Sequence, residues 1–272
     1  MIIFPNAKIN IGLNIVSKRE DSYHNLETVF YPIPLTDVLE IIVPDKVINE
    51  SNIQLSGTNL NIPNNDNICI KAYKILAKDY DLPSLQMFLH KIIPSGAGLG
   101  GGSADAGFLL NQLNNYFKLN INDDKLIEYA SKIGADCAFF IKNKAVFASG
   151  IGNKFEDIEL NLSNYYILIV KPDFSINTAI AFKGIKPEMP KHSLKVLIKQ
   201  PVSLWRKNIK NDFEKPLFEE YPELNKIKSD LYDLGAEYAS MSGSGSAMFG
   251  LFKTMPNPSN LFKNCFVWKS KL

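Results

Sequence analysis

Residues Pro94–Gly107 read Pro-Ser-Gly-Ala-Gly-Leu-Gly-Gly-Gly-Ser-Ala-Asp-Ala-Gly, and the rest of the chain is interpreted around this stretch. Five glycines fall within seven positions, namely Gly96, Gly98, Gly100, Gly101 and Gly102. Glycine adopts positive φ at little cost and lets the backbone approach a ligand closely. The accessible peptide N–H groups of such a loop suit a polyanion better than they suit a hydrophobic core.

Regular elements are expected on both sides of this loop. Leu85–His90 places alternate apolar residues on one face, which predicts a strand, and Ser103 is predicted to cap a helix that ends near Lys118. A helix N-terminus carries partial positive charge and unpaired N–H donors, which stabilise a phosphate placed there. A strand, a glycine loop and a helix in this order favour a phosphate-binding site over a flexible linker.

Known phosphate-binding motifs fit the loop only in part. Gly96, Gly98 and Gly101 match G-x-G-x-x-G, and Asp123 follows at roughly the distance of a ribose-binding acid. However, Asn122–Lys125 is expected to open a second helix where a dinucleotide fold needs a strand. The Walker A pattern lacks its lysine, and the protein-kinase signatures do not occur. The residues therefore indicate a loop that binds nucleotide phosphate without a lysine of its own.

Composition excludes several classes of protein. The chain has 272 residues with 30 basic and 28 acidic side chains, and a formal charge near zero gives no support for nucleic-acid or membrane-surface binding. No apolar run approaches the roughly 20 residues of a membrane span, and the N-terminus lacks the features of a signal peptide. Cys69, Cys137 and Cys265 are few and far apart. These features predict a cytoplasmic protein without disulfides, a zinc site, a nucleic-acid partner or a membrane partner.

The first half of the chain reads mainly as strands with a few polar residues of interest. Ala7–Val16 alternates, so that Lys8 and Asn10 share one face of a half-buried strand, which is either solvated or part of a site. Tyr23 and His24 could stack on a base and hydrogen-bond to it, or lie at the surface. Further strands are expected at Leu26–Ile33, Asp37–Val43, Ile53–Ser56 and Ala145–Gly150, and helices at Ile68–Leu76 and Asp123–Ile133, the last with Gly134 at its C′ position.

Asp136 stands between a helix-ending glycine and an apolar run. An unpaired buried charge is costly, so this carboxylate needs a cationic or hydrogen-bonding partner unless it caps the next segment.

The second half of the chain is predicted to fold as a ferredoxin-like α/β sandwich. Strands are expected at Tyr165–Val170, Ala236–Met241, Ala247–Phe252 and Phe266–Lys269, and helices at Ser175–Phe182, His192–Lys207 with a break at Pro201, Glu223–Leu234 and Ser259–Lys263. Ser242–Ser246 forms a second tight loop of small residues. A domain change is expected near Gly150–Asn153, which gives domains 1–155 and 156–272.

Three stretches together resemble the GHMP kinases, a family that includes galactokinase, homoserine kinase and mevalonate kinase. Pro94–Ala106 is similar to the central phosphate-binding motif, Met241–Gly250 to the C-terminal glycine motif, and Ala7–Ile11 to the N-terminal motif. The resemblance covers nearly the whole chain. It implies an α+β, two-domain GHMP kinase fold, with an N-terminal domain like domain 2 of ribosomal protein S5 and a C-terminal ferredoxin-like α/β sandwich.

Within the family, Tyr23–Phe30, Asp66–Ile68 and Gly134–Phe140 resemble one branch in particular. That branch uses ATP to phosphorylate a hydroxyl on the methylerythritol end of a cytidine diphosphate conjugate, in non-mevalonate isoprenoid synthesis. The chain departs from it at Ser22, where the branch usually has glycine, and at the pair Cys137-Ala138, where it usually has Val-Pro. We expect a monomer or a weak homodimer.

The resemblance also implies a role for individual residues. Asp136 would be the general base that takes the proton of the substrate hydroxyl, and Lys8 would hold its carboxylate ionised. ATP would be bound by Asn67, Pro94, Gly96, Gly98, Leu99, Gly100, Gly101, Gly102 and Ser103, and Ser103 would also help to hold Mg²⁺. The cytidine conjugate would be bound by Asn10, Tyr23, His24, Phe182, Gly243 and Ser244.

Three other functions are compatible with parts of the sequence. Another GHMP kinase would act on homoserine or a mevalonate derivative, although Tyr23 and His24 then have no base to contact. An oxidoreductase would bind NAD through the G-x-G-x-x-G match. An RNA-binding module would use the fold shared with ribosomal proteins, which the balanced charge disfavours.

Overall fold

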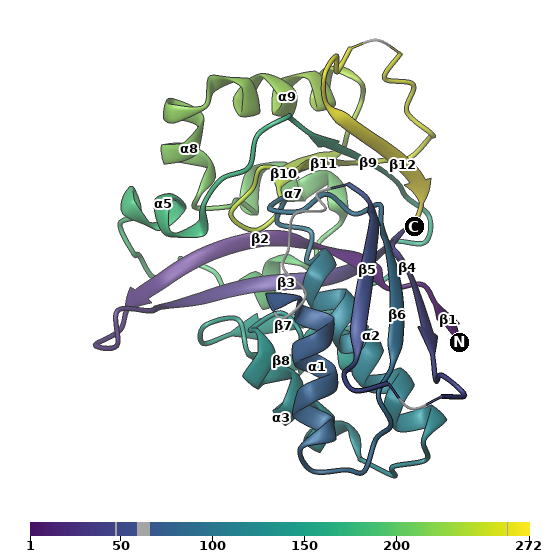
Figure 1. Ribbon diagram of the computed structural model, residues 1–272. Helices are drawn as coiled ribbons and strands as arrows, with labels where there is room; N and C mark the ends of the chain where they lie inside the picture. Colours follow the sequence, from purple (N-terminus) through teal and green to yellow (C-terminus); the bar gives the residue numbers. More distant parts are fainter. Residues whose placement is uncertain (47, 59–65, 260) are drawn as a thin grey trace. The chain divides into compact units, whose positions relative to one another are not determined.

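The structure is a computed structural model that describes residues 1–46, 48–58, 66–259 and 261–272 (Figure 1). The chain folds into two compact units, neither of which is continuous in sequence. The first unit comprises residues 1–7, 35–95 and 100–144, and the second comprises 8–34, 96–99 and 145–272. The expected domain boundary after residue 155 stays a prediction.

The first unit contains a four-stranded sheet in the order β1-β4-β6-β5. Its strands are β1 (Ile2–Ile3), β4 (Val38–Ile42), β5 (Asn52–Gly57) and β6 (Gln86–Lys91). β4 pairs antiparallel with β1 and β6, whereas β5 pairs parallel with β6. Parallel neighbours need a crossover connection, and helix α1 (Ile68–Ala77) lies in that connection.

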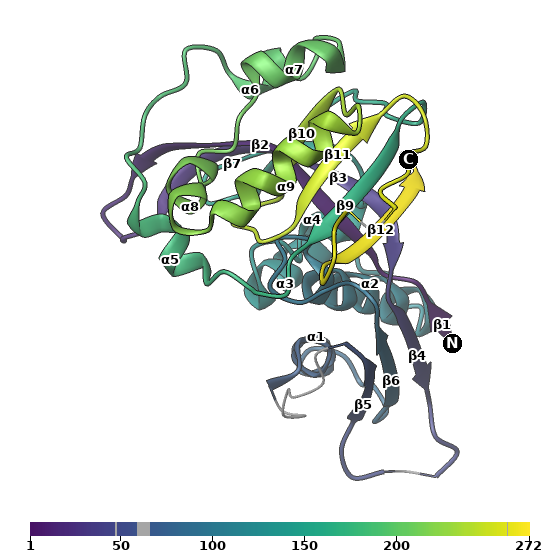
Figure 2. The same cartoon turned by 90° about the horizontal axis from the view of Figure 1, so that it is seen from above.

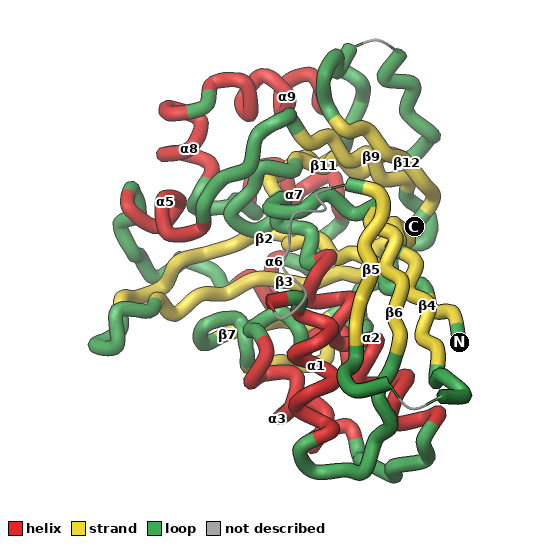
Figure 3. Tube along the Cα trace, viewed as in Figure 1, coloured by secondary structure: helices red, strands yellow, loops and turns green. Residues whose placement is uncertain are grey.

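Helices gather beside this sheet, as the red tubes next to β5 and β6 in Figure 3 show. They are α1, α2 (Gly101–Tyr116), α3 (Asp123–Ile133) and α4 (Phe139–Lys142), and α1, α2 and α3 all contact one another. Asn67 and Asn122 cap α1 and α3 through their side-chain oxygens.

Two details at the helix ends were predicted wrongly. Ser103 does not cap α2, because the helix begins two residues earlier and its N-cap is Gly100. Gly134 ends α3 as an extended C-cap residue with φ −176°, so it is not a left-handed C′ glycine.

The second unit carries most of a sheet in the order β2-β3-β7-β8. Its strands are β2 (Asn6–Lys18), β3 (His24–Thr36), β7 (Val146–Ser149) and β8 (Lys154–Asp157). The polar face of β2 is not solvated, since Lys8 and Asn10 are each only 3% exposed and Asn14 is 6% exposed. The expectation of a half-buried strand is therefore wrong for β2, which is buried on both faces over most of its length.

The other sheet of the second unit has the order β10-β11-β9-β12 with every neighbouring pair antiparallel. Its strands are β9 (Tyr166–Lys171), β10 (Tyr238–Met241), β11 (Met248–Phe252) and β12 (Phe266–Lys271). This order is the ferredoxin-like arrangement that the sequence predicts. Helix α9 (Pro222–Asp233) packs on β10 and β11, as Figure 2 shows.

The core of the second unit lies between α9 and these strands. It includes Leu168, Val170, Leu224, Ile227, Leu231, Ala239, Met241, Met248 and Phe252. The remaining helices are α5 (Thr178–Lys183), α6 (Leu194–Leu197), α7 (Val202–Asn208) and α8 (Glu214–Glu220). The break at Pro201 is confirmed between α6 and α7, whereas α8 was not predicted.

The connection from β11 to β12 differs from the expectation. The predicted helix over residues 259–263 is wrong for the described part of that segment, where Ser259 and residues 261–263 form turns; residue 260 lies outside the described residues. The second crossover of the sandwich is therefore made without a helix there. None of the helices in the described ranges is both long and apolar enough to cross a lipid bilayer.

Candidate active site

The glycine loop leaves β6 and turns into α2 through residues with positive φ. Gly96, Gly98 and Gly100 have φ of 62°, 75° and 72°, in the left-handed region that favours glycine. A Cβ atom added to Gly98 would overlap with the backbone carbonyl oxygen of Ser242. Glycine is thus required at this position both by its backbone conformation and by the close approach of another chain segment.

The last two glycines of the motif belong to helix α2 itself. Gly101 and Gly102 are its first residues, and the carbonyl of Gly100 accepts the N–H of Ala104 at 2.8 Å. A glycine N-cap offers no side chain to the N–H groups of the first turn, which include that of Ser103. These donors are therefore left to water or to an anion at the positive end of the helix.

The Ser103 side chain contacts Cys137, which stands where the branch that the sequence resembles usually has valine. Its hydroxyl hydrogen-bonds the thiol of Cys137, and burial raises the pKa of that thiol to about 11 although this hydrogen bond acts in the opposite direction. The thiol is therefore neutral at pH 7. Ala138 has φ −62°, a value that proline also adopts. The backbone of this turn is therefore compatible with alanine here and with the proline that the branch usually has.

Asp105 is buried inside α2 and takes part in an ion cluster. Its Oδ2 accepts a hydrogen bond of 2.6 Å from Lys91 Nζ, and Lys91 also pairs with the fully buried Asp37. Burial raises the pKa of Asp105 to about 8. The neighbouring Asp37 carboxylate acts in the same direction, and Lys91 opposes both effects only in part. Asp105 therefore acts neither as a helix cap nor as an exposed ligand group. Asp37 and Lys91 were not predicted from the sequence.

A row of hydrogen bonds fixes the polar face of β2. Lys8 Nζ donates to Asn10 Oδ1 at 2.5 Å, Asn10 Nδ2 donates to Thr28 Oγ1 at 3.0 Å, and Thr28 Oγ1 donates to the carbonyl of Gly12 at 2.6 Å. The Lys8 ammonium also lies 4.7 Å from the centre of the Phe30 ring, within the range of a cation–π contact. Two residues predicted for the site, Lys8 and Asn10, are thus direct partners.

The second glycine loop meets this row of residues. The Ser242 hydroxyl accepts the N–H of Asn10 at 3.1 Å and donates to the carbonyl of Gly98 at 2.8 Å. A Cβ on Gly243 would lie 3.2 Å from Asn10 Oδ1. Parts of all three sequence motifs therefore converge within the second unit. Ser242 was not among the predicted site residues, although it stands directly before Gly243 in the small-residue run.

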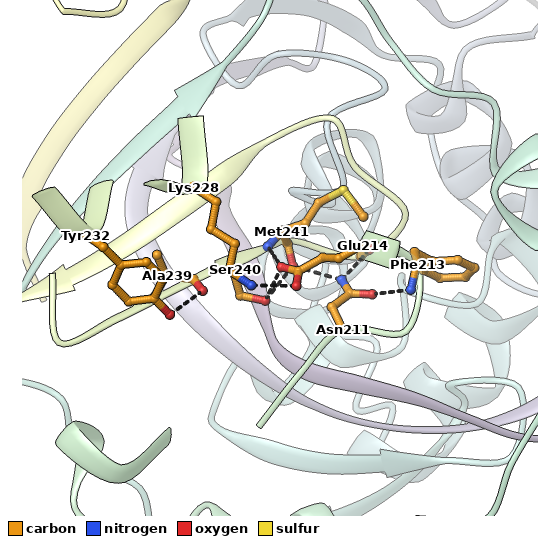
Figure 4. Close-up of polar contacts among 9 residues, drawn as sticks. Asn211, Phe213, Glu214, Lys228, Tyr232, Ala239, Ser240 and Met241 are labelled. Carbon is orange, nitrogen blue, oxygen red and sulfur yellow. Dashed lines mark hydrogen bonds and ion pairs between the residues drawn. The ribbon is translucent and has the colours of Figure 1, made fainter. Parts of the chain in front are cut away.

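A buried polar network holds the second loop from behind (Figure 4). Asn211 Nδ2 donates to the carbonyls of Met241 and Gly243 at 2.9 and 2.8 Å, on either side of Ser242. Glu214 Oε1 accepts the N–H of Met241 at 2.9 Å, and Lys228 pairs with Oε2 of the same carboxylate at 2.5 Å. Both backbone neighbours of Ser242 are therefore held in place by side chains that lie outside the loop.

The aromatic residues predicted to bind a base lie together. The rings of His24 and Phe182 stack with centroids 4.7 Å apart and an interplanar angle of 15°. Burial lowers the pKa of His24, and the charge of Lys18 acts in the same direction. A base cannot lie between two rings in direct contact, so binding there requires the rings to part. Tyr23 is 61% exposed, and Ser244 hydrogen-bonds Thr178 at 3.1 Å.

The remaining predicted residues have defined local positions. Asp136 is half-buried in the turn between α3 and α4, in the first unit, whereas Lys8 belongs to the second, and their pairing stays a prediction. Asn67 is buried and its Oδ1 accepts the N–H of Cys69 at 2.8 Å. Pro94 and Leu99 are buried, and the Leu99 carbonyl accepts the N–H of Lys8 at 3.0 Å.

Comparison with known families accounts for these features. The model of the GHMP kinase N-terminal domain matches residues 67–144, and the model of the GHMP kinase C-terminal domain matches residues 193–264. Together they cover more than half of the chain. The chain belongs to the GHMP kinase family, whose members are small-molecule kinases, and the oxidoreductase and RNA-binding alternatives are therefore wrong.

Individual relatives show which members of the family this chain is similar to. A Bacteroides fragilis protein named 4-diphosphocytidyl-2-C-methyl-D-erythritol kinase is 51% identical over 278 residues, which cover 100% of both chains. A protein of the same name from Parabacteroides distasonis is 49% identical over 274 residues, with 100% of both chains covered. A crystal structure of 4-(cytidine 5'-diphospho)-2C-methyl-D-erythritol kinase superposes with a TM-score of 0.82 and 26% identity, over 99% of this chain and 98% of the other.

Proposed function

We propose that this protein transfers the γ-phosphoryl group of ATP to a hydroxyl on the methylerythritol end of 4-diphosphocytidyl-2-C-methyl-D-erythritol. The observation that carries this proposal is the full-length likeness, at about half identity, to relatives that bear the name of that activity. The reaction is a step of isoprenoid precursor synthesis, and we propose that it takes place in the cytoplasm and that the protein is a monomer or a weak homodimer.

The glycine loop and the start of α2 suit the phosphates of ATP. Gly98 leaves no room for a side chain, Gly96 and Gly100 adopt left-handed conformations, and the first-turn N–H groups of α2 have no side-chain cap. Backbone donors at a helix N-terminus stabilise negative charge that grows during phosphoryl transfer. In this proposal Pro94, Leu99 and the neighbouring glycines shape the cradle, and Asn67 approaches the adenine.

Mg²⁺ is expected to arrive with the nucleotide. Within the described parts of the chain no three His, Cys, Asp or Glu side chains are grouped so that they could hold a metal ion. The donor available beside the helix N-terminus is the Ser103 hydroxyl, a hard oxygen ligand of the kind Mg²⁺ accepts, together with the phosphate oxygens themselves. Bound Mg²⁺ would supply charge neutralisation at the phosphates.

Phosphoryl transfer asks a protein mainly for positioning, charge neutralisation and an oriented nucleophile. We assign the last role to Asp136, which would accept the proton of the attacking hydroxyl. Lys8 would keep that carboxylate ionised, and its hydrogen bond to Asn10 holds the ammonium at a fixed place on β2. General-base assistance of this kind contributes about 10²–10⁴ in rate.

The cytidine end would be held by the aromatic residues of the second unit. Tyr23, His24 and Phe182 offer stacking surfaces, and a neutral His24 ring can both donate and accept a hydrogen bond at a cytosine edge. Asn10, Gly243 and Ser244 would approach the rest of the conjugate.

A substrate comparison tests the proposal. The purified protein is assayed for ADP release with ATP, Mg²⁺ and one of three acceptors, namely the cytidine conjugate, homoserine or mevalonate. We expect turnover with the conjugate and at most a trace with the others. Preferred turnover of homoserine or mevalonate would refute the substrate assignment and leave membership of the family untouched.

A further inference from the structure

The two chain segments that flank the glycine loop are joined to each other by buried charges within the first unit. The chain enters the loop through Lys91–Ile93 and leaves it at Gly101, the first residue of α2. A Cβ on Gly101 would lie 2.8 Å from Ile93 Cγ2 and 3.4 Å from Lys91 Nζ. The entering segment and the first helical turn are therefore in direct contact.

Asp37 holds the entering segment. It lies between β3 and β4, its side chain is fully buried, and its own N–H donates to the carbonyl of Pro5 at 2.9 Å. Oδ1 accepts the N–H of Ile92 at 2.5 Å and the N–H of Ile93 at 2.8 Å, and Oδ2 pairs with Lys91. One carboxylate thus binds three consecutive residues at the point where β6 passes into the loop.

Lys91 continues this connection to the helix. Its ammonium, 8% exposed, bridges Asp37 and Asp105 Oδ2, and Asp105 lies one turn into α2. Charge-assisted hydrogen bonds are about twice as strong as neutral ones, and burial strengthens them further. The path from Asp37 through Lys91 to Asp105 therefore ties the entrance of the loop to its exit.

We propose that Asp37, Lys91 and Asp105 are positioning residues that fix the distance between the two ends of the phosphate loop, so that its N–H groups are arranged before the nucleotide binds. The proposal rests on the proposed function, because it assumes that this loop holds ATP phosphates. A preorganised site loses less conformational entropy on binding, and this gain is expected in nucleotide affinity.

The sharpest test is Asp105→Ala. This substitution removes the link to the helix and leaves Lys91 and Asp37 as a neutral buried pair, so the fold is expected to survive. Binding of the non-hydrolysable analogue adenylyl imidodiphosphate with Mg²⁺ is measured by titration calorimetry on the full chain. We expect the dissociation constant to rise at least about fivefold, while the KM of the acceptor alcohol changes less than about twofold.

Asn111→Ala is the matched control. Asn111 lies further along α2, where its Nδ2 donates to the Ile141 carbonyl at 2.9 Å, so its loss weakens the packing of the same helix away from the loop. We expect a lower melting temperature and an unchanged nucleotide affinity. An equal loss of affinity in both variants would mean that general loosening of α2 is responsible, and it would overturn the proposal.

Asp105→Asn covers the case in which the alanine variant fails to fold. It keeps the shape and one acceptor but cannot become charged, so at pH 9, above the Asp105 pKa of about 8, an affinity loss of about twofold or more is expected. Unchanged affinity in a folded Asp105 variant, or loss of the fold in both, would overturn the proposal. If the unsubstituted protein does not bind the analogue, the proposed function itself fails, which is a different result from unchanged affinity in the variant.

Discussion

The hydroxyl of Ser242 donates a hydrogen bond of 2.8 Å to the carbonyl oxygen of Gly98, 144 positions away in the chain. The same hydroxyl accepts the backbone N–H of Asn10 at 3.1 Å. One buried serine therefore joins the N-terminal strand β2, the first glycine loop and the second glycine loop. The same contact explains why position 98 is glycine, because a Cβ on Gly98 would overlap with the Ser242 carbonyl oxygen.

Replacing Ser242 by alanine is expected to weaken both the fold and the binding of substrates. The change leaves the N–H of Asn10 and the carbonyl of Gly98 buried without this partner, which costs about 1–3 kcal/mol for each group. We expect a lower free energy of unfolding in urea and a higher KM for ATP. Ser240→Ala is the control, since Ser240 is buried near the end of β10, two residues before Ser242, but its hydroxyl donates to Glu214 at 3.1 Å. It should lower stability without raising KM, and a KM rise in both variants would contradict the specific role of Ser242.

Alanine substitutions at two glycines of the first loop should act in opposite directions. Gly98 has φ 75° and faces the Ser242 backbone, so Gly98→Ala is expected to lower the free energy of unfolding by about 2 kcal/mol or more. Gly102 is helical, and its nearest neighbour for a Cβ is Ile68 Cγ2 at 3.8 Å. Alanine favours helix by up to about 1 kcal/mol, so Gly102→Ala should be neutral or stabilising. The free energy of unfolding of both variants is measured by urea denaturation. Equal destabilisation by the two substitutions would contradict the different roles given to Gly98 and Gly102.

The catalytic assignment predicts a large loss of turnover without loss of fold. Asp136→Ala and Lys8→Ala are each expected to lower kcat by about 10² or more, because each removes part of the same proton-accepting pair. Circular dichroism checks that the variants are folded. If Lys8 acts through Asp136, the double variant should lose little more than either single variant. Near-normal turnover of Asp136→Ala would contradict the general-base assignment. If the losses of the two single variants add up in the double variant, Lys8 does not act through Asp136.

His24 predicts a pH dependence that is confined to substrate binding. Its pKa lies below the ordinary value of 6.5, mainly because burial disfavours the charged ring, and so the ring is neutral at pH 7 and becomes charged only as the pH falls further. Protonation removes the acceptor nitrogen and places a cation near Lys18. The KM for the cytidine conjugate should therefore be constant from about pH 9 to pH 7 and rise only below the ordinary imidazole pKa of about 6.5.

The His24→Phe variant provides the control for this profile. It keeps a ring that can stack on Phe182 but cannot titrate, so its KM should be higher and no longer rise at low pH. A wild-type KM that stays constant down to pH 5 would exclude a binding role for the neutral imidazole.

Ser22 is predicted to carry backbone strain that glycine would relieve. It has φ 68° in the turn between β2 and β3, a conformation that costs an ordinary residue roughly 1–2 kcal/mol. The greater freedom of glycine in the unfolded chain offsets part of this relief, so Ser22→Gly should raise the free energy of unfolding by up to about 1 kcal/mol. Ser163→Gly, in an exposed turn where φ is not positive, should lower it. Destabilisation by Ser22→Gly would show that the turn is not strained.

The features that the sequence determined by itself are those set by local pattern. The glycine-rich stretch Pro94–Gly107 was predicted to be a loop between a strand and a helix, and the order of apolar runs predicted the ferredoxin-like sheet. The spacing of apolar residues over Ile68–Leu76 predicted helix α1, which spans Ile68–Ala77. Such signals depend on neighbouring residues, which is why they can be detected without the fold.

Tertiary structure alone decided which polar groups are buried and which residues they bind. The alternation of β2 left open whether its lysine and amides are solvated or part of a site, and the structure shows them buried. Asp37, Lys91 and Ser242 gave no signal, since their partners are 54, 14 and 232 positions away. The helix predicted over residues 259–263 is absent from the described residues 259 and 261–263, because packing easily overrides helix propensity in a short segment. Contacts between distant segments form only when the whole chain packs, and no local pattern encodes them.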